Sequence, residues 1–167
     1  MRTLIVYESA WGNTRAVAEA VAEGMAGDVA PPEVVGVEAA PPLDGLQVEL
    51  LVVGAPTHAF GLSREGTRED AHKRGGDLLT TGVRDWLDAA TGARLGVATF
   101  DTHVSHPNLP GRASRSAAKK LKRLGCHLVV DPESFYVDDY EGPLLPGELE
   151  RARAWGAELA GTVGSAS

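Results

Sequence analysis

One stretch near the amino end of the chain, residues 4–21, constrains the fold more than any other. It begins with the apolar and β-branched run LIVY at residues 4–7, which is too short for a buried helix. It ends with alanine, valine and glutamate at helical spacing over residues 16–21. The stretch therefore predicts a strand, a tight loop and a helix in direct succession, and the loop is where we expect the chemistry.

The loop between this strand and helix has the residues of an anion-binding turn. Gly12 allows the backbone to turn tightly and to approach a ligand, while Ser9, Asn13 and Thr14 carry short hydroxyl and amide groups. The first N–H groups of a helix have no partner within it, so a phosphate can bind there without a lysine. A structural role, in which Ser9 or Asn13 caps the helix and Gly12 makes the turn, fits equally well. The loop has neither the Lys-Ser/Thr ending of a P-loop nor the G-x-G-x-x-G of a dinucleotide site.

Composition and charge limit the classes of partner and binding site that the chain can have. The 167 residues suffice for one domain with its own core, and the net charge of -7 argues against nucleic acid or an anionic membrane as the main partner. No apolar run reaches membrane-spanning length and no signal sequence is evident, so we expect a cytoplasmic protein. We expect one domain over residues 1–163 with a loose tail at 164–167. Cys126 is the only cysteine and the histidines lack a clustered third ligand, so neither a disulfide nor a metal site is expected.

Strand and helix patterns alternate along the rest of the chain. Further short apolar strands are predicted at residues 33–38, 49–54, 94–100 and 127–130, with 134–137 as an extension of the last. Helices are predicted at residues 81–89, 114–124 and 147–159. The segment 64–73 is too charged for the core and is predicted as a solvated loop or short helix. This alternation predicts a doubly wound α/β sandwich of three layers around a five-stranded parallel sheet.

The first loop resembles that of a known family. The segment Ser9-Ala10-Trp11-Gly12-Asn13-Thr14 is similar to the FMN-phosphate loop of the flavodoxin family, (S/T)-x-T-G-x-T, at its first, fourth and sixth positions. Trp11 replaces the usual threonine, as an aromatic residue does in the flavodoxin-like quinone reductases of the tryptophan-repressor-binding-protein type. The resemblance implies strand order 2-1-3-4-5 and FMN held non-covalently at the carboxyl ends of strands 1, 3 and 4, with no catalytic side chain. Flavodoxin is itself one of the examples on which this placement rule is based.

The loop after the third strand carries a second similarity. Residues 54–61, GAPTHAFG, resemble the G-x-P-T-x-F-G loop that borders the isoalloxazine ring in those reductases, with one extra residue here. The resemblance implies an aromatic wall from Phe60, with Trp11 as a second candidate, and polar contacts from Thr57 and His58. The cofactor-binding residues expected in these two loops are Ser9, Ala10, Trp11, Gly12, Asn13, Thr14, Pro56, Thr57, His58, Phe60 and Gly61.

A third loop is expected after the fourth strand. It comprises Phe100, Asp101, Thr102 and His103, whose backbone is expected to bind the N3 and O2 region of the flavin. Asp101 at that edge would disfavour an anionic reduced flavin and lower its potential, whereas protonated His103 would raise it. The sequence leaves open which of the two side chains faces the ring.

Three functions remain open at this stage. The first is an FMN protein that carries electrons between a reductase and an acceptor protein. The second is an FMN-dependent NAD(P)H:quinone reductase acting on small quinones, which the Pro-Thr loop favours. The third is a flavin-free binding module, which Trp11 favours. Neither nucleic acid nor membrane is an expected partner, and the chain is expected to be a monomer or weak homodimer. A phospho-receiver domain is disfavoured because the third strand ends in Gly54-Ala55-Pro56 where that class needs an aspartate.

Overall fold

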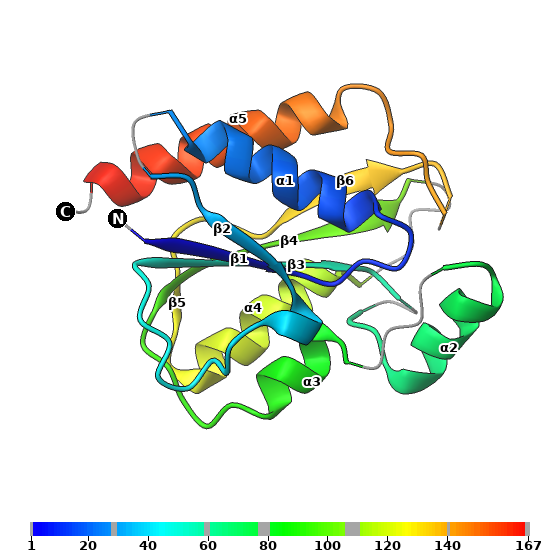
Figure 1. The fold of residues 1–167 in the computed structure, drawn as a ribbon, viewed down its shortest axis with the longest axis horizontal. Coiled ribbons are helices and arrows are strands. Elements are labelled where there is room, and N and C mark those ends of the chain that lie inside the picture. Colours follow the sequence, from blue (N-terminus) through cyan, green and yellow to red (C-terminus); the bar gives the residue numbers. More distant parts are fainter. Residues whose placement is uncertain are drawn as a thin grey trace.

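The chain forms three layers, with a sheet between two pairs of helices (Figure 1). The computed structural model describes residues 2–27, 30–58, 61–76, 81–105, 111–139 and 141–165. The strands are β1 Thr3–Tyr7, β2 Glu33–Gly36, β3 Leu50–Pro56, β4 Gly96–Val104, β5 His127–Leu128 and β6 Glu133–Val137. The helices are α1 Asn13–Met25, α2 Glu65–Lys73, α3 Val83–Asp88, α4 Ala113–Leu124 and α5 Glu148–Ser165, with a 3-10 turn η1 at Val37–Ala39.

The sheet is parallel, and its order β2-β1-β3-β4-β5 confirms the predicted doubly wound topology. β6 is an additional strand. It pairs with β4 from Phe100 to Val104, beyond the two residues of β4 that pair with β5. The expected continuous fifth strand is therefore two short strands, and the interruption contains Pro132, which has no N–H to donate to a ladder.

β4 is longer than the sequence pattern predicts. It runs to Val104, so the four residues expected in a loop after the fourth strand lie in the strand itself. The ladder continues because β4 is central, with β3 pairing as far as Thr102 on one side and β6 as far as Val104 on the other. The polar residues that resemble a loop in the sequence are instead buried at the carboxyl end of a central strand.

Alternation along the strands produces a core on each face of the sheet. Leu4 and Val6 of β1 face the cluster under α3 and α4, whereas Ile5 faces the cluster under α1 and α5. Continuous apolar strands of this kind are typical of a parallel sheet covered on both faces. The charged segment after β3 forms α2 beside the sheet, and no helix within the described ranges is long and apolar enough to cross a membrane (Figure 1).

Two glycines bring α1 and α5 into backbone contact. A Cβ at Gly24 would lie 1.9 Å from the carbonyl oxygen of Arg153, and one at Gly156 would lie 2.2 Å from that of Val21. Both distances are far below van der Waals contact, so only glycine permits this approach. This packing fixes the position of α1, whose amino end follows the first loop. α5 continues to Ser165, past the expected domain end at residue 163.

Candidate functional site

The first loop leads from β1 into α1 through a left-handed glycine. Gly12 has φ of 89°, and a side chain there would meet nothing within 4 Å, so the turn lies beside open space. Its N–H donates to Ser9 Oγ at 3.0 Å, and its carbonyl accepts the first helical hydrogen bond, from the Ala16 N–H at 2.9 Å. The N–H groups of residues 13–15 precede that bond and have no acceptor within the helix. Within the described ranges no side chain caps α1, and its first turn contains no acidic residue.

Asn13 and Thr14 turn toward other segments of the chain. Asn13 Nδ2 donates to the carbonyl oxygen of Glu141 at 3.1 Å. The hydroxyl of Thr14, which is buried, lies 2.9 Å from that of Thr102 on β4. The side chains of these two predicted residues thus join the first loop to the rest of the sheet edge, while the backbone amides remain at the helix start.

Trp11 packs against the segment that contains α2. A Cβ on Gly76, just after that helix, would lie 3.0 Å from Trp11 Cε2 and 3.2 Å from the Cβ of Ala10. Ala10 is buried and Trp11 is half-buried. The tryptophan that replaces the expected threonine therefore has a packing partner, and this contact ties α2 to the first loop.

The second loop joins the same junction. Thr57 follows Pro56, the last residue of β3; its N–H donates to the carbonyl oxygen of Thr102 at 2.9 Å, and its hydroxyl accepts from the Ala113 N–H at 3.2 Å. His58 and Gly61 then exchange two backbone hydrogen bonds, of 2.7 and 2.9 Å, which closes a tight turn. Phe60, the predicted aromatic wall, lies outside the described residues.

Thr102 connects all three predicted loops. Its hydroxyl pairs with Thr14 of the first loop, and its carbonyl accepts from Thr57 of the second. The predicted convergence of these segments at one edge of the sheet is present in the structure. This edge is the carboxyl end of β1, β3 and β4, where ligands bind in doubly wound folds.

The side chains of the other predicted residues on β4 contact the core, α4 and β6. Phe100 is 1 % exposed and its ring lies over Gly54, edge-on to Phe135 and Trp155 in the core. Asp101 is buried, and its Oδ2 accepts from the N–H and the hydroxyl of Ser114 at 2.9 and 2.6 Å, at the start of α4.

His103 is also buried. Its Nδ1 lies 2.7 Å from the carbonyl oxygen of Val104, and its ring meets Tyr136 edge to face, with centroids 6.4 Å apart. The side chains of Asp101 and His103 are thus both engaged within the protein.

A buried carboxylate that the sequence analysis does not select lies directly after β1. Glu8 is 1 % exposed and accepts from the Ser63 hydroxyl at 2.5 Å and from the Val83 N–H at 2.8 Å. Arg68, which is also buried, donates to the same hydroxyl at 3.2 Å and pairs with Asp85 at 2.9 Å. Burial raises the pKa of Glu8 above its usual value, against the opposing effect of these donors. The network joins the end of β1 to α2 and α3.

His58, near the same edge, also has a shifted pKa. Burial, reinforced by the charge of Arg68, lowers the pKa of His58 to about 4. The imidazole is therefore neutral at pH 7, and it cannot supply a positive charge to a ligand there.

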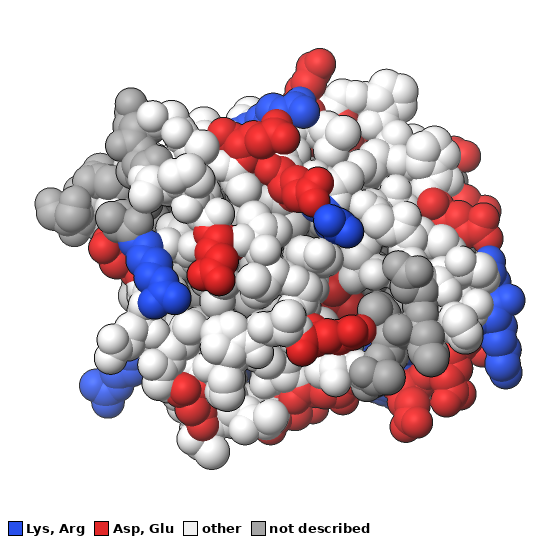
Figure 2. All heavy atoms as spheres, in the orientation of Figure 1, with Lys and Arg blue, Asp and Glu red and all other residues white. Residues whose placement is uncertain are grey.

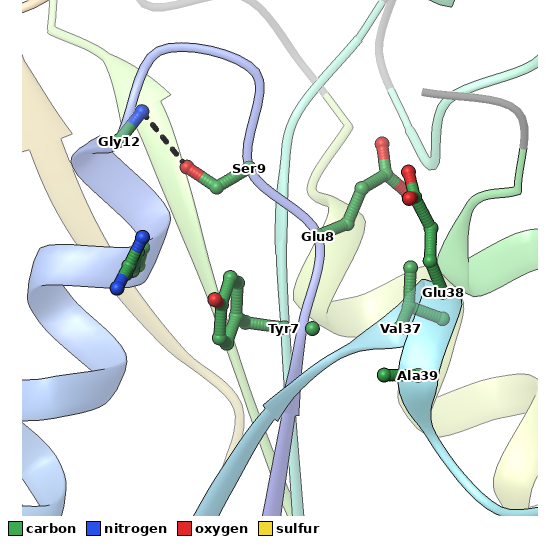
Figure 3. A pocket seen from close by; sticks show the side chains of 9 residues that line it. Tyr7, Glu8, Ser9, Gly12, Val37, Glu38 and Ala39 are labelled. Atoms are coloured by element: carbon green, nitrogen blue, oxygen red, sulfur yellow. Dashed lines mark hydrogen bonds between the residues drawn. The ribbon is translucent and has the colours of Figure 1, made fainter. Parts of the chain in front are cut away.

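A cavity of about 310 Å³ opens beside the first loop. Its lining includes four residues of β1, the first loop and α1, namely Tyr7, Ser9, Gly12 and Arg15. Residues 36–39 of β2 and η1 also line it. Figure 3 shows Tyr7 and Glu8 on opposite sides of β1, and Ser9 directed at the Gly12 N–H. The cavity gives a ligand access to the start of α1. In the part of the chain that the structure describes, no group of histidine, cysteine and acidic side chains is arranged to hold a metal ion.

Comparison with solved structures identifies the architecture. A flavodoxin from the domain Archaea is 22% identical with a TM-score of 0.69, and the alignment covers 98% of this chain and 99% of that one. The chain has the flavodoxin-like fold. Oxidised flavodoxin 1 from Bacillus cereus shares this fold with 20% identity, a TM-score of 0.69 and coverage of 96% and 98%.

The WrbA-like flavodoxin from Agrobacterium tumefaciens also has the flavodoxin-like fold, with 22% identity, a TM-score of 0.62 and 98% coverage of both chains. No protein-family model matches the sequence, and no curated protein is significantly similar to it. The similarity to these proteins is therefore one of fold.

Proposed function

We propose that this chain is a flavoprotein that binds FMN non-covalently at the carboxyl ends of β1, β3 and β4 and transfers electrons through it. The observation that carries the proposal is the unequal capping of three helices at this edge. Glu8 accepts from the first N–H of α3, and Asp101 accepts from the second residue of α4, so the chain supplies its own carboxylate to each. Among the described residues, no side chain accepts from the first N–H groups of α1, which begins beside open space. A ligand phosphate supplies the missing anion.

The residues around the start of α1 fit a phosphate ester. The amides of residues 13–15 and the hydroxyl of Ser9, whose oxygen already accepts from Gly12, are available to donate to phosphate oxygens. Thr102 fixes the backbone of the second loop relative to the first, so the flavin ring would lie against segments held in register. The bound flavin supplies the redox chemistry, and the protein orients it and sets its electrostatic surroundings.

The surface is suited to a basic partner. The net charge is -7. On the face of the molecule drawn in Figure 2, acidic side chains are spread widely and basic side chains are fewer. Electrostatic attraction to a basic partner raises association rates, and salt screens that attraction. We propose a reductase and an acceptor protein as the partners of a carrier of this kind.

A matched pair of glycine variants tests the cofactor site. Gly12 and Gly45 have φ of 89° and 79°, and a Cβ at either would meet nothing within 4 Å. Gly45 lies in the connection from β2 to β3, before the amino end of β3, whereas Gly12 is in the proposed phosphate loop. Gly12→Val and Gly45→Val should lose similar stability from backbone strain, but only Gly12→Val should lose FMN affinity.

The measurement is a titration of FMN fluorescence with the apoprotein of each variant. The Gly45→Val protein is expected to bind FMN as the parent chain does, because its strain is remote from the site. Equal FMN affinity in the two variants, or no FMN binding by the parent chain, would contradict the proposal.

A second candidate function is an FMN-dependent NAD(P)H:quinone reductase. The observation that favours it is the α2 segment, which lies between β3 and α3 and packs Gly76 against Trp11 of the first loop. This segment places additional protein surface beside the proposed flavin site, where a second substrate would bind. Rapid bleaching of bound flavin on stopped-flow mixing with NADPH is expected of a reductase, and its absence of a carrier.

A further inference from the structure

A second cavity, also of about 310 Å³, lies beside the turn that His58 and Gly61 close. It is bounded by the turn itself, α2, α3 and the first turn of α4. Arg64 and Thr67 line it from the start of α2, Arg84 from α3 and Ser116 from α4. None of the residues that line the first cavity takes part in it. The two cavities are therefore separate.

Arg84 is held in place by two backbone carbonyl groups. Its Nε donates to the carbonyl oxygen of Ser63 at 3.3 Å, and its Nη2 donates to that of Leu62 at 3.1 Å. These two bonds fix the plane of a half-buried guanidinium and leave its remaining N–H groups for another acceptor. Within the described ranges, no carboxylate pairs with it. Two neutral carbonyls orient this positive charge but do not neutralise it.

Arg64, which is exposed, also lines this cavity and carries a second positive charge. Its backbone N–H donates to the Thr67 hydroxyl at 2.8 Å, which fixes the start of α2, and no carboxylate in the described part of the chain pairs with its guanidinium. Other arginines of this acidic chain do have such partners, for example Arg68 with Asp85 and Arg153 with Glu23.

The remaining lining groups are neutral donors or acceptors. No aspartate or glutamate is among the described residues that line the cavity, and the hydroxyls of Thr67 and Ser116 border it. His58 adds a ring that is uncharged at pH 7, because burial lowers its pKa to about 4. The cavity thus combines two guanidinium charges with hydroxyl groups in a chain whose net charge is -7.

We propose that this cavity binds a phosphoryl group of a small molecule other than FMN. One guanidinium group can donate two parallel hydrogen bonds to the oxygens of a phosphate. A guanidinium that the protein already orients loses less conformational freedom on binding. The volume of about 310 Å³ suits a phosphoryl group with an attached sugar and is too small for a macromolecular surface. Because His58 and Gly61 also border the proposed flavin, the phosphoryl group would anchor a phosphorylated electron donor beside it. That last assignment rests on the proposed function.

Isothermal titration calorimetry of the full chain saturated with FMN, at low ionic strength, tests the site. The probes are inorganic phosphate and adenosine 2′,5′-bisphosphate. Arg64→Gln is expected to weaken phosphate binding about tenfold or more, since it removes charge-assisted hydrogen bonds. Arg84→Gln is expected to do the same, and Arg84→Lys, which keeps the charge without the planar fork, to be intermediate. Arg94→Gln, an exposed arginine away from both cavities, makes the same charge change and should leave the affinity unaltered.

The outcomes separate the sources of the phosphoryl group and the two proposals. Tighter binding of the bisphosphate than of phosphate supports a nucleotide ligand, and equal binding supports free phosphate. No phosphate binding by the parent chain, or unchanged affinity in Arg64→Gln, overturns the site even if Arg84→Gln fails to fold. Loss of FMN affinity in the arginine variants shows that the cavity holds the FMN phosphate and overturns a separate site. If the chain binds no FMN, the same titrations on the FMN-free chain still decide whether the cavity takes phosphate.

Discussion

Replacing Glu8 by glutamine should change how the stability of this protein depends on pH. The carboxyl group is 1 % exposed, and burial raises its pKa in the folded state above the usual 4.5. Between the unfolded and the folded pKa, the folded protein holds a proton that the unfolded chain has released. The free energy of unfolding therefore falls as the pH rises through this window, by up to about 1.4 kcal/mol per pH unit for one proton.

The glutamine side chain cannot ionise, so the free energy of unfolding of the Glu8→Gln variant should not fall with pH in this way. Its amide oxygen can still accept from the Val83 N–H, but its NH2 group replaces the carboxyl oxygen that accepts from the Ser63 hydroxyl, and we expect a cost of about 1–2 kcal/mol at pH 4.5. The stability advantage of the parent chain should therefore be greatest near pH 4.5. It should shrink as the pH rises through the folded pKa of Glu8 and then become constant.

Urea unfolding followed by tryptophan fluorescence, at half-unit steps from pH 4.5 to 8, measures the difference between the two proteins. Groups that titrate alike in both cancel in this difference. Glu38→Gln, which removes an exposed carboxyl group on η1, controls for the loss of one negative charge. An advantage of the parent chain that grows with pH would mean that Arg68 and the hydrogen-bond donors outweigh burial, and it would refute the reasoning.

Changes to the helix packing and to the other buried polar groups should also have measurable effects. Gly156→Ala should lower the free energy of unfolding by roughly 1–3 kcal/mol, because its Cβ would lie 2.2 Å from a backbone oxygen. Gly161→Ala in the same helix, where a Cβ would meet nothing within 4 Å, should raise it by about 0.5–1 kcal/mol. Urea unfolding measures both changes. Asp101→Ala should cost about 1–3 kcal/mol in the same assay, because the N–H and hydroxyl of Ser114 lose their acceptor, and Asp101→Asn should cost less. The ring protons of His58 should show no titration shift by NMR between pH 8 and 5.5, since burial lowers its pKa to about 4; its contribution to stability should fall as the pH drops from 6.5 toward that value.

The sheet order can be predicted from the sequence because the signals that specify it are local. Apolar runs such as residues 50–53 and helical patterns such as residues 16–21 alternate at regular spacing, and right-handed crossovers leave few arrangements of such units. The loop at residues 9–14 can be compared with the flavodoxin phosphate loop for the same reason, because the similarity lies in one short, continuous motif. The prediction for the end of β4 is wrong because Asp101 and His103 are polar, whereas pairing with β3 as far as Thr102 and with β6 as far as Val104 continues the strand.

The buried polar network cannot be predicted in this way because its partners are far apart in sequence. Glu8 meets Ser63 and Val83 across 55 and 75 residues, and nothing near Glu8 in the chain indicates that it is buried. A charged residue after a strand is ordinarily solvated. The same separation conceals Arg84, whose carbonyl partners lie 21 and 22 residues away on the segment after β3.

The arrangement of carboxylates explains why the ligand-binding edge tolerates so many buried polar groups. In a doubly wound fold, helices begin near the carboxyl ends of the strands, so several sets of unpaired N–H groups gather at one edge. Glu8, at the end of β1, satisfies α3, and Asp101 on β4 satisfies α4, each through a carboxylate that would be costly to bury without those donors. α1 packs on the opposite face of the sheet from α3 and α4 and receives neither carboxylate. Its amides lack an internal anion where Gly12 leaves space for one, and this asymmetry, more than the loop motif alone, favours an external phosphate at α1.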